Sequence, residues 1–217
     1  MPHVKTKRDD ILRPPEILDT VRKARDNGQD WLACAISIAT IFGKRVNEIM
    51  SLTREQIVFD DKFLTIRFRV GKKREKDTPI PIFYLKRKTL QHPLVQYIKS
   101  HVDTINTGYI FPSSRKPTQV NIKRAVTLKD GSTTNLEYNY TTPGGYISPS
   151  LARYYLKKIA PSWWWHLCRE SLATSMAEEG ATEEELMHWF DWETPNSPHK
   201  YVKRGTRLTE KWSERGW

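Results

Sequence analysis

The sequence is poor in cysteine and has no long hydrophobic run, and both absences narrow the classes of protein it can be. Only two cysteines occur among 217 residues. They are too few for a disulfide framework, and no Cys/His group has the spacing of a zinc site. The longest nearly apolar run, Leu32 to Phe42, is too short to span a bilayer, and no apolar segment follows a basic start at the N-terminus. We therefore expect Cys34 and Cys168 to be buried free thiols of a cytoplasmic protein.

Acidic residues are in deficit as well. There are 36 Lys and Arg against 25 Asp and Glu, which gives a formal net charge of +11. Such a balance predicts an anionic partner, with nucleic acid as the first candidate and an anionic membrane surface as the second. Aromatic residues make up 11% of the chain, which argues against intrinsic disorder.

The charges are distributed unevenly, so we expect a polarised surface. Residues 62–76 contain seven basic side chains and one acid, whereas residues 177–193 contain seven acids and no Lys or Arg. We interpret the acidic stretch as a solvated face, because carboxylates in a first helical turn complement the helix dipole. The basic side chains that we predict to contact a polyanion are Arg67, Arg69, Lys73, Arg74, Lys76, Lys203 and Arg204.

Hydrophobic periodicity predicts an α+β fold that is mainly helical, with a small antiparallel sheet. We expect a strand at 62–70, a basic turn, and a second strand at 78–84 that Pro79 and Pro81 mark as an edge. A second hairpin is expected around Asp130-Gly131. The expected helices are 14–26, 31–42, 45–52, 92–101, 148–159, 163–179, 182–190 and a short segment at 199–204.

Two pairs of charged side chains stand at helical spacing. His166 and Arg169 are three residues apart on an expected helix and should share a face. Arg45 follows Gly43 at the end of the apolar helix, and Glu48 lies one turn later, where it can hold Arg45 by a charge-assisted hydrogen bond. Taken alone, the spacing of His166 and Arg169 is more simply explained by a surface pair or a core histidine. Arg45 and Glu48 taken alone are explained by a surface ion pair of little energetic value.

Together with a basic hairpin and Tyr201, these pairs form a set suited to phosphodiester chemistry. Arginines bind non-bridging oxygens and stabilise the charge of the transition state. A lysine can protonate a leaving 5′ oxygen, and a phenol can attack phosphorus and form a phosphotyrosine.

Several short motifs follow one another along the chain in an order that is typical of a known family. Residues 43–52 read Gly-Lys-Arg-Val-Asn-Glu-Ile-Met-Ser-Leu after an apolar helix, and residues 79–82 read Pro-Ile-Pro-Ile after the basic hairpin. His166 to Arg169 reads His-Leu-Cys-Arg, and Gly180-Ala181 follows at a helix stop. In this order they resemble the boxes of the tyrosine recombinases, or phage-type integrases, over about residues 16–205. Lys44 departs from the family, which has a small or apolar residue there.

The third box of that family ends in His or Trp shortly before the nucleophile. His188 and Trp192 are both candidates, and we choose Trp192 because its distance to Tyr201 has the family's length. Asp191 then stands where the family usually has Gly. The last boxes are similar in style to those of integrases from archaeal mobile elements.

The resemblance implies the fold of a recombinase catalytic domain and a role for each residue. Trp192 would donate its indole N–H, and Lys72, with Lys73 as the alternative, would be the general acid. The full implied catalytic set is Arg45, Lys72, His166, Arg169, Trp192 and Tyr201, with Glu48 in support, Tyr201 as nucleophile and no metal or cofactor.

The implied activity is site-specific DNA recombination through a 3′-phosphotyrosyl intermediate, including integration of a viral genome. The implied partners are double-stranded DNA and further copies of the chain in a dimer or tetramer, and no membrane. We expect a flexible lead-in at 1–13, the catalytic domain at 14–205 and a tail at 206–217. A type IB topoisomerase-like enzyme and a non-catalytic DNA-binding module remain alternatives.

Overall fold

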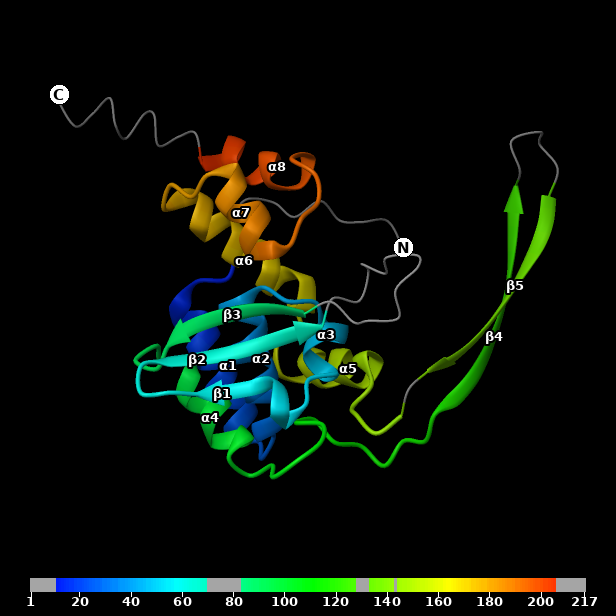
Figure 1. The fold of residues 1–217 in the computed structure, drawn as a ribbon, viewed down its shortest axis with the longest axis horizontal. Coiled ribbons are helices and arrows are strands. Elements are labelled where there is room, and N and C mark those ends of the chain that lie inside the picture. The colour runs from blue at the N-terminus through cyan, green and yellow to red at the C-terminus, as the bar shows by residue number, and fades with distance from the viewer. Residues whose placement is uncertain (1–10, 70–82, 128–132, 143, 206–217) are drawn as a thin grey trace.

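The computed structural model describes residues 11–69, 83–127, 133–142 and 144–205. Helices dominate this part of the chain, and they are joined by a three-stranded and a two-stranded antiparallel sheet (Figure 1). The elements are α1 (Pro14–Asp26), α2 (Asp30–Phe42), α3 (Val46–Met50), η2 (Arg54–Gln56), β1 (Ile57–Phe59), β2 (Phe63–Arg69), β3 (Phe83–Thr89), α4 (Val95–Val102), β4 (Thr118–Thr127), β5 (Thr133–Thr142), α5 (Pro149–Ile159), α6 (Trp165–Glu178), α7 (Glu183–Phe190) and α8 (Asn196–Gly205).

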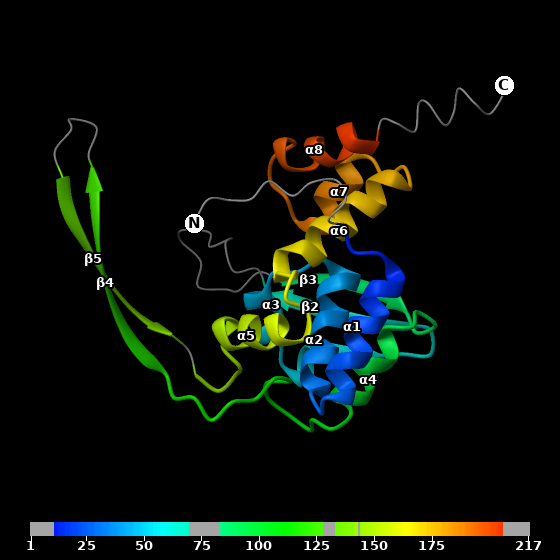
Figure 2. The same ribbon diagram turned by 180° about the vertical axis from the view of Figure 1, so that it is seen from behind.

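The elements form a two-layer body with a helical group at one end. The sheet β1-β2-β3 covers α1, α2 and α4, which lie behind it in Figure 1 and in front of it in Figure 2. Helices α6, α7 and α8 lie together at one end of this body, and both views show the β4–β5 ribbon projecting away from it. The expected α+β class, mainly helical with a small antiparallel sheet, is confirmed.

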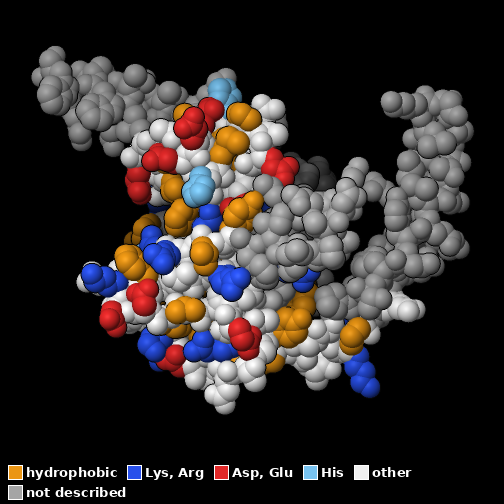
Figure 3. Space-filling view, in the orientation of Figure 1, with side chains coloured by type: hydrophobic (Ala, Val, Ile, Leu, Met, Phe, Trp, Pro, Cys, Tyr) orange, Lys and Arg blue, Asp and Glu red, His pale blue; other side chains and the backbone are white. Residues whose placement is uncertain are grey.

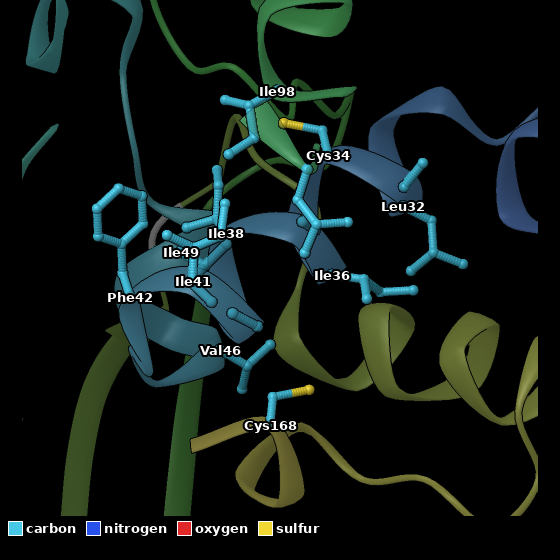
Figure 4. Packing of buried hydrophobic residues seen from close by; sticks show 14 of the residues in the cluster. Leu32, Cys34, Ile36, Ile38, Ile41, Phe42, Val46, Ile49, Ile98 and Cys168 are labelled. Atoms are coloured by element: carbon cyan, nitrogen blue, oxygen red, sulfur yellow. The ribbon is translucent and has the colours of Figure 1, made fainter. Parts of the chain in front are cut away.

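Helix α2 forms the centre of the core because it is apolar on nearly every face. All of its residues from Leu32 to Phe42 are buried. It ends at Gly43, whose φ of 61° lies in the left-handed region that glycine adopts without a Cβ clash. Figure 4 shows its side chains pointing toward neighbouring helices, with Val46 of α3 directed toward Cys168 of α6.

Both cysteines are buried free thiols, as expected. Burial raises the pKa of the Cys168 thiol to about 12 and that of Cys34 even further. Both thiols therefore stay protonated and behave as small apolar side chains.

The helix predictions are mostly confirmed. Helix α1 has the expected bounds, Ser148 accepts a hydrogen bond from Leu151 at the start of α5, and the capping box of Thr182 and Glu185 opens α7. The expected start of α6 at residue 163 is wrong, because Trp164 is the N-cap residue and the helix begins at Trp165.

The strand predictions need larger corrections. Strand β2 pairs with Phe83–Thr89, so the second strand continues past the expected end at 84, while the expected part at 78–82 lies outside the described residues. Strand β1 was not expected. The polar run Lys86-Arg87-Lys88 conceals β3 from a reading of hydrophobic alternation, although Lys86 faces the interior. The second hairpin is present as expected, and its strands are ten residues each and pair from Thr118↔Thr142 to Thr127↔Thr133. Among the helices described, none has the length and apolar character needed to cross a membrane.

Candidate active site

Arg45 and Glu48 form a hydrogen-bonded unit at the start of α3. Arg45 is the N-cap residue, and its backbone N–H donates to Glu48 Oε2 at 2.9 Å. Its guanidinium Nη1 donates to Glu48 Oε1 at 3.0 Å. Glu48 is buried and the arginine is partly exposed, so a fixed carboxylate holds a guanidinium at the surface.

Arg169 is held deep in the same region. Only 2% of its surface is exposed. Its Nη1 donates to the carbonyl of Gly43 at 2.6 Å and its Nη2 to the carbonyl of Phe190 at 2.5 Å. Burial, followed by the positive charge of Arg45, lowers the pKa of Arg169 to about 10. Arg169 therefore stays charged at neutral pH, and the positive charge of Arg45 is close enough to act on it.

Three aromatic rings stack beside this guanidinium. Trp192 lies parallel to Tyr201, with ring centroids 5.5 Å apart and 4° between the planes, and its other neighbour is Phe190 at 4.7 Å. The Arg169 guanidinium carbon lies 5.3 Å from the Trp192 ring centroid. Tyr201, on α8, is only 2% exposed. The structure thus brings Arg169, Trp192 and Tyr201 together in one chain.

The two candidates for the third box, His188 and Trp192, lie in different surroundings. The His188 side chain is exposed on α7, and its backbone carbonyl accepts a hydrogen bond from Lys86. Trp192 instead lies between Phe190 and Tyr201. Of the two candidates, Trp192 is the one in contact with Tyr201, and its assignment to the third box stays a prediction.

His166 lies one turn before Arg169 on α6, as expected, but its surroundings differ. The histidine side chain is largely exposed, and its Nε2 lies 3.8 Å from Glu170 Oε1, whereas Arg169 is buried. The shared face predicted from their spacing is therefore only approximate, with His166 at its solvent edge.

Basic side chains outside this cluster fall into two groups. Arg67 and Arg69 are exposed on β2, and Lys203 and Arg204 belong to the last turn of α8. Figure 3 shows acidic side chains over the helices α6–α8, and Lys and Arg side chains interspersed with acidic ones over the sheet side of the body. The remaining predicted basic residues, Lys72, Lys73, Arg74 and Lys76, lie outside the described residues.

The prediction from sequence missed one feature, a buried cluster of Lys44, Lys86 and Asp191 beside the site. Lys44 and Lys86 both contact the Asp191 carboxylate. Two of its three members could have been singled out from the sequence. Lys44 and Asp191 are the two positions at which the motifs depart from the family pattern.

Comparison with known families decides the identity of the fold. The model of the phage integrase family matches residues 12–206, nearly the whole chain. The chain belongs to the phage integrase family. No curated protein matches it.

Solved structures of the same fold include recombinases bound to DNA. The XerH site-specific recombinase in a pre-cleavage complex with its difH substrate is 13% identical with a TM-score of 0.59, over 94% of this chain and 52% of that one. The XerA recombinase is 13% identical with a TM-score of 0.61, over 99% and 65% of the two chains. The Tn1549 transposon integrase in complex with circular intermediate DNA is 11% identical with a TM-score of 0.57, over 91% and 63%. The chain thus spans about half to two thirds of these proteins.

Proposed function

We propose that this chain is the catalytic part of a site-specific DNA recombinase that cleaves and rejoins DNA through a phosphotyrosine. The observation that carries the proposal is the meeting of Arg169, Trp192 and Tyr201, which are brought together from α6, the end of α7 and α8. Arg45 adds a second guanidinium within electrostatic range. Family membership and the likeness to DNA-bound recombinases support the same reaction.

In the proposed reaction the Tyr201 hydroxyl loses its proton, and its oxygen attacks the scissile phosphorus. The bond from phosphorus to the 5′ oxygen breaks, and the phosphate remains joined to the 3′ side and to Tyr201. Lys72 protonates the departing 5′ oxygen, with Lys73 as the alternative donor. The free 5′ hydroxyl of another strand then attacks the phosphotyrosine and releases the enzyme.

The arginines supply the positive charge for this step. Guanidinium groups bind phosphate oxygens by paired hydrogen bonds, and fixed charges in a buried site stabilise a transition state strongly. A guanidinium has five N–H donors, so Arg169 keeps donors for a phosphate beyond its bonds to the two carbonyls. Because it is only 2% exposed, it must first be uncovered when DNA binds. His166 and the Trp192 indole add further donors. This set needs neither a metal ion nor ATP.

The burial of Tyr201 has a consequence for access. Because only 2% of this residue is exposed, its hydroxyl cannot meet a phosphate in a duplex while α8 keeps this position. We therefore expect α8 to shift when DNA binds, which would separate Tyr201 from Trp192.

The proposed partners are double-stranded DNA and further copies of this chain in a dimer or tetramer. Exposed Arg67 and Arg69 on β2 and the net charge of +11 support contact with phosphates. We assign the catalytic domain to residues 14–205, with 1–13 as a lead-in and 206–217 as a tail.

The experiment that tests this function is covalent trapping on a nicked suicide DNA substrate. The wild-type protein should form a denaturant-resistant adduct in excess chelator, and Tyr201→Phe should form none while it keeps its fold and its DNA affinity. Tyr154→Phe, which alters an exposed tyrosine on α5, is the matched control and should react normally.

Further outcomes of this assay test the finer assignments. An adduct that peptide mapping places on another tyrosine would refute the role of Tyr201, and relaxation of supercoils without strand exchange would favour a topoisomerase. Lys72→Ala should slow cleavage, and a 5′-phosphorothiolate leaving group, which needs no proton, should restore the rate. Rescue of Lys73→Ala instead would move the general acid by one residue.

A further inference from the structure

The two departures from the family pattern contact each other in the folded chain. Lys44 Nζ donates to Asp191 Oδ2, and the two side chains are only 2% and 10% exposed. A third charge joins them, because Lys86 Nζ lies 3.3 Å from Asp191 Oδ1. One carboxylate therefore bridges two buried lysines that come from the first box and from β3.

Burying these three charges carries a large desolvation penalty. Buried ion pairs are often matched or exceeded in stability by apolar residues of similar volume. Here burial lowers the pKa of Lys44 against the opposing effect of Asp191, and two cations share one anion. Lys86 gains a second partner in the His188 carbonyl at 2.7 Å. The cluster is thus better explained by what it holds in place than by net stabilisation.

What it holds is the backbone that binds Arg169. Gly43 and Phe190, whose carbonyls accept from the Arg169 guanidinium, directly precede Lys44 and Asp191 in the chain. The contact of Lys44 with Asp191 therefore fixes the separation of the two acceptors.

The conformation of Asp191 points to the same role. It has φ of 54°, and among the described residues it is the one non-glycine with positive φ. Glycine would adopt this conformation with less strain, but it would remove the carboxylate that both lysines contact. The presence of Asp191 at this position indicates that its contacts with Lys44 and Lys86 outweigh the backbone strain of its positive φ.

The geometry points to Lys44 and Asp191 as positioning residues that act through the two backbone carbonyls to orient Arg169 toward the scissile phosphate. Lys86 links the same carboxylate to β3 and so ties the base of the β2–β3 hairpin to the site. This inference rests on the proposed recombinase function, because it assigns the orientation a part in strand cleavage.

The test compares variants that remove charge with little change of shape. Lys44→Met leaves Asp191 paired with Lys86 and should fold, and Asp191→Asn keeps a residue that tolerates positive φ. Each should slow single-turnover cleavage at saturating DNA by about 10²-fold, because small misplacements of a binding group have effects of this size. The dissociation constant for DNA should change by less than about twofold, since phosphate contacts along the duplex supply most of the affinity. The double variant should be no slower than the slower single variant, because both act through one contact.

Two controls separate positioning from stability. Lys99→Met removes an exposed ion pair on α4 and should leave cleavage and folding unchanged. Val102→Ala opens a cavity in the core at the same helix and should lower the unfolding midpoint without slowing cleavage by folded protein. If Lys44→Met behaves like Val102→Ala, the cluster is structural and the inference is overturned.

A second readout is independent of catalysis. The ¹⁵N-detected guanidinium signals of Arg169, assigned by their loss in Arg169→Lys, should exchange slowly with solvent in the wild-type protein. Lys44→Met should speed this exchange by about 10-fold or more, because the bonds to the carbonyls open more often. If the wild-type protein forms no adduct, the recombinase function fails and the exchange rates decide whether the pair orients Arg169. Unchanged exchange in both variants would refute the inference.

Discussion

Gly43→Ala tests whether the turn between α2 and α3 is shaped for the site. The φ of this residue is 61°, so an alanine there carries the left-handed penalty of about 1–2 kcal/mol. Its Cβ would also collide with the Phe190 ring, with Cδ1 at 3.0 Å, and would lie 3.2 Å from Leu172 Cδ2. Overpacking of a buried ring adds about 1–3 kcal/mol. We expect a total loss of about 2–5 kcal/mol in the free energy of unfolding, from the sum of these two terms.

Gly28→Ala is the matched control for the backbone term alone. Gly28 has φ of 69° at the end of α1, and an added Cβ there meets nothing within 4 Å. Urea unfolding of both variants isolates the steric term as the difference between them. Gly43→Ala should also slow strand cleavage by the folded protein, because a displaced Phe190 moves the carbonyl that holds Arg169. Equal losses of stability in the two variants, with normal cleavage by both, would refute the reasoning.

Three further predictions concern separate parts of the molecule. Trp192→Phe should keep the stack on Tyr201 but slow cleavage by about 10²-fold through loss of the indole donor, and Trp192→His should react faster than Trp192→Phe in the trapping assay. Charge reversal of Arg67 and Arg69 together should lower the slope of log affinity against log salt by about 2, measured by DNA titration, and an unchanged slope would remove β2 from the interface. Hydrogen bonds from its own backbone N–H and from that of Gly108 lower the pKa of Glu55 from 4.5 to about 2. Because this folded pKa is depressed, the carboxylate stabilises the fold above about pH 4.5 and the contribution is lost as pH falls through about 2. The stability deficit of Glu55→Gln should therefore shrink across that range in acid titrations followed by circular dichroism, and a constant deficit would contradict the assignment.

The sequence by itself determined the helices and the order of the motif boxes. Helix α1 begins at Pro14 and ends before Gly28, and α7 opens with the Thr182 capping box, because these signals act within one or two turns. The contact of Arg45 with Glu48 was predictable for the same reason, as it spans three residues. Strand β3 escaped prediction because its burial depends on which strand it pairs with rather than on its own alternation.

Only the tertiary structure decided how the boxes meet. Arg169 takes its acceptors from Gly43 and Phe190, and Lys44 pairs with Asp191 across 147 residues of sequence. In the sequence these last two residues are merely exceptions to a pattern. The sign of each charge can be read locally, but its partner depends on packing that brings the end of α2 against the end of α7. A buried charge is tolerated only where that packing supplies its counterion. Lys44 and Asp191 supply this counterion to each other, and the pairing exists only in the folded chain.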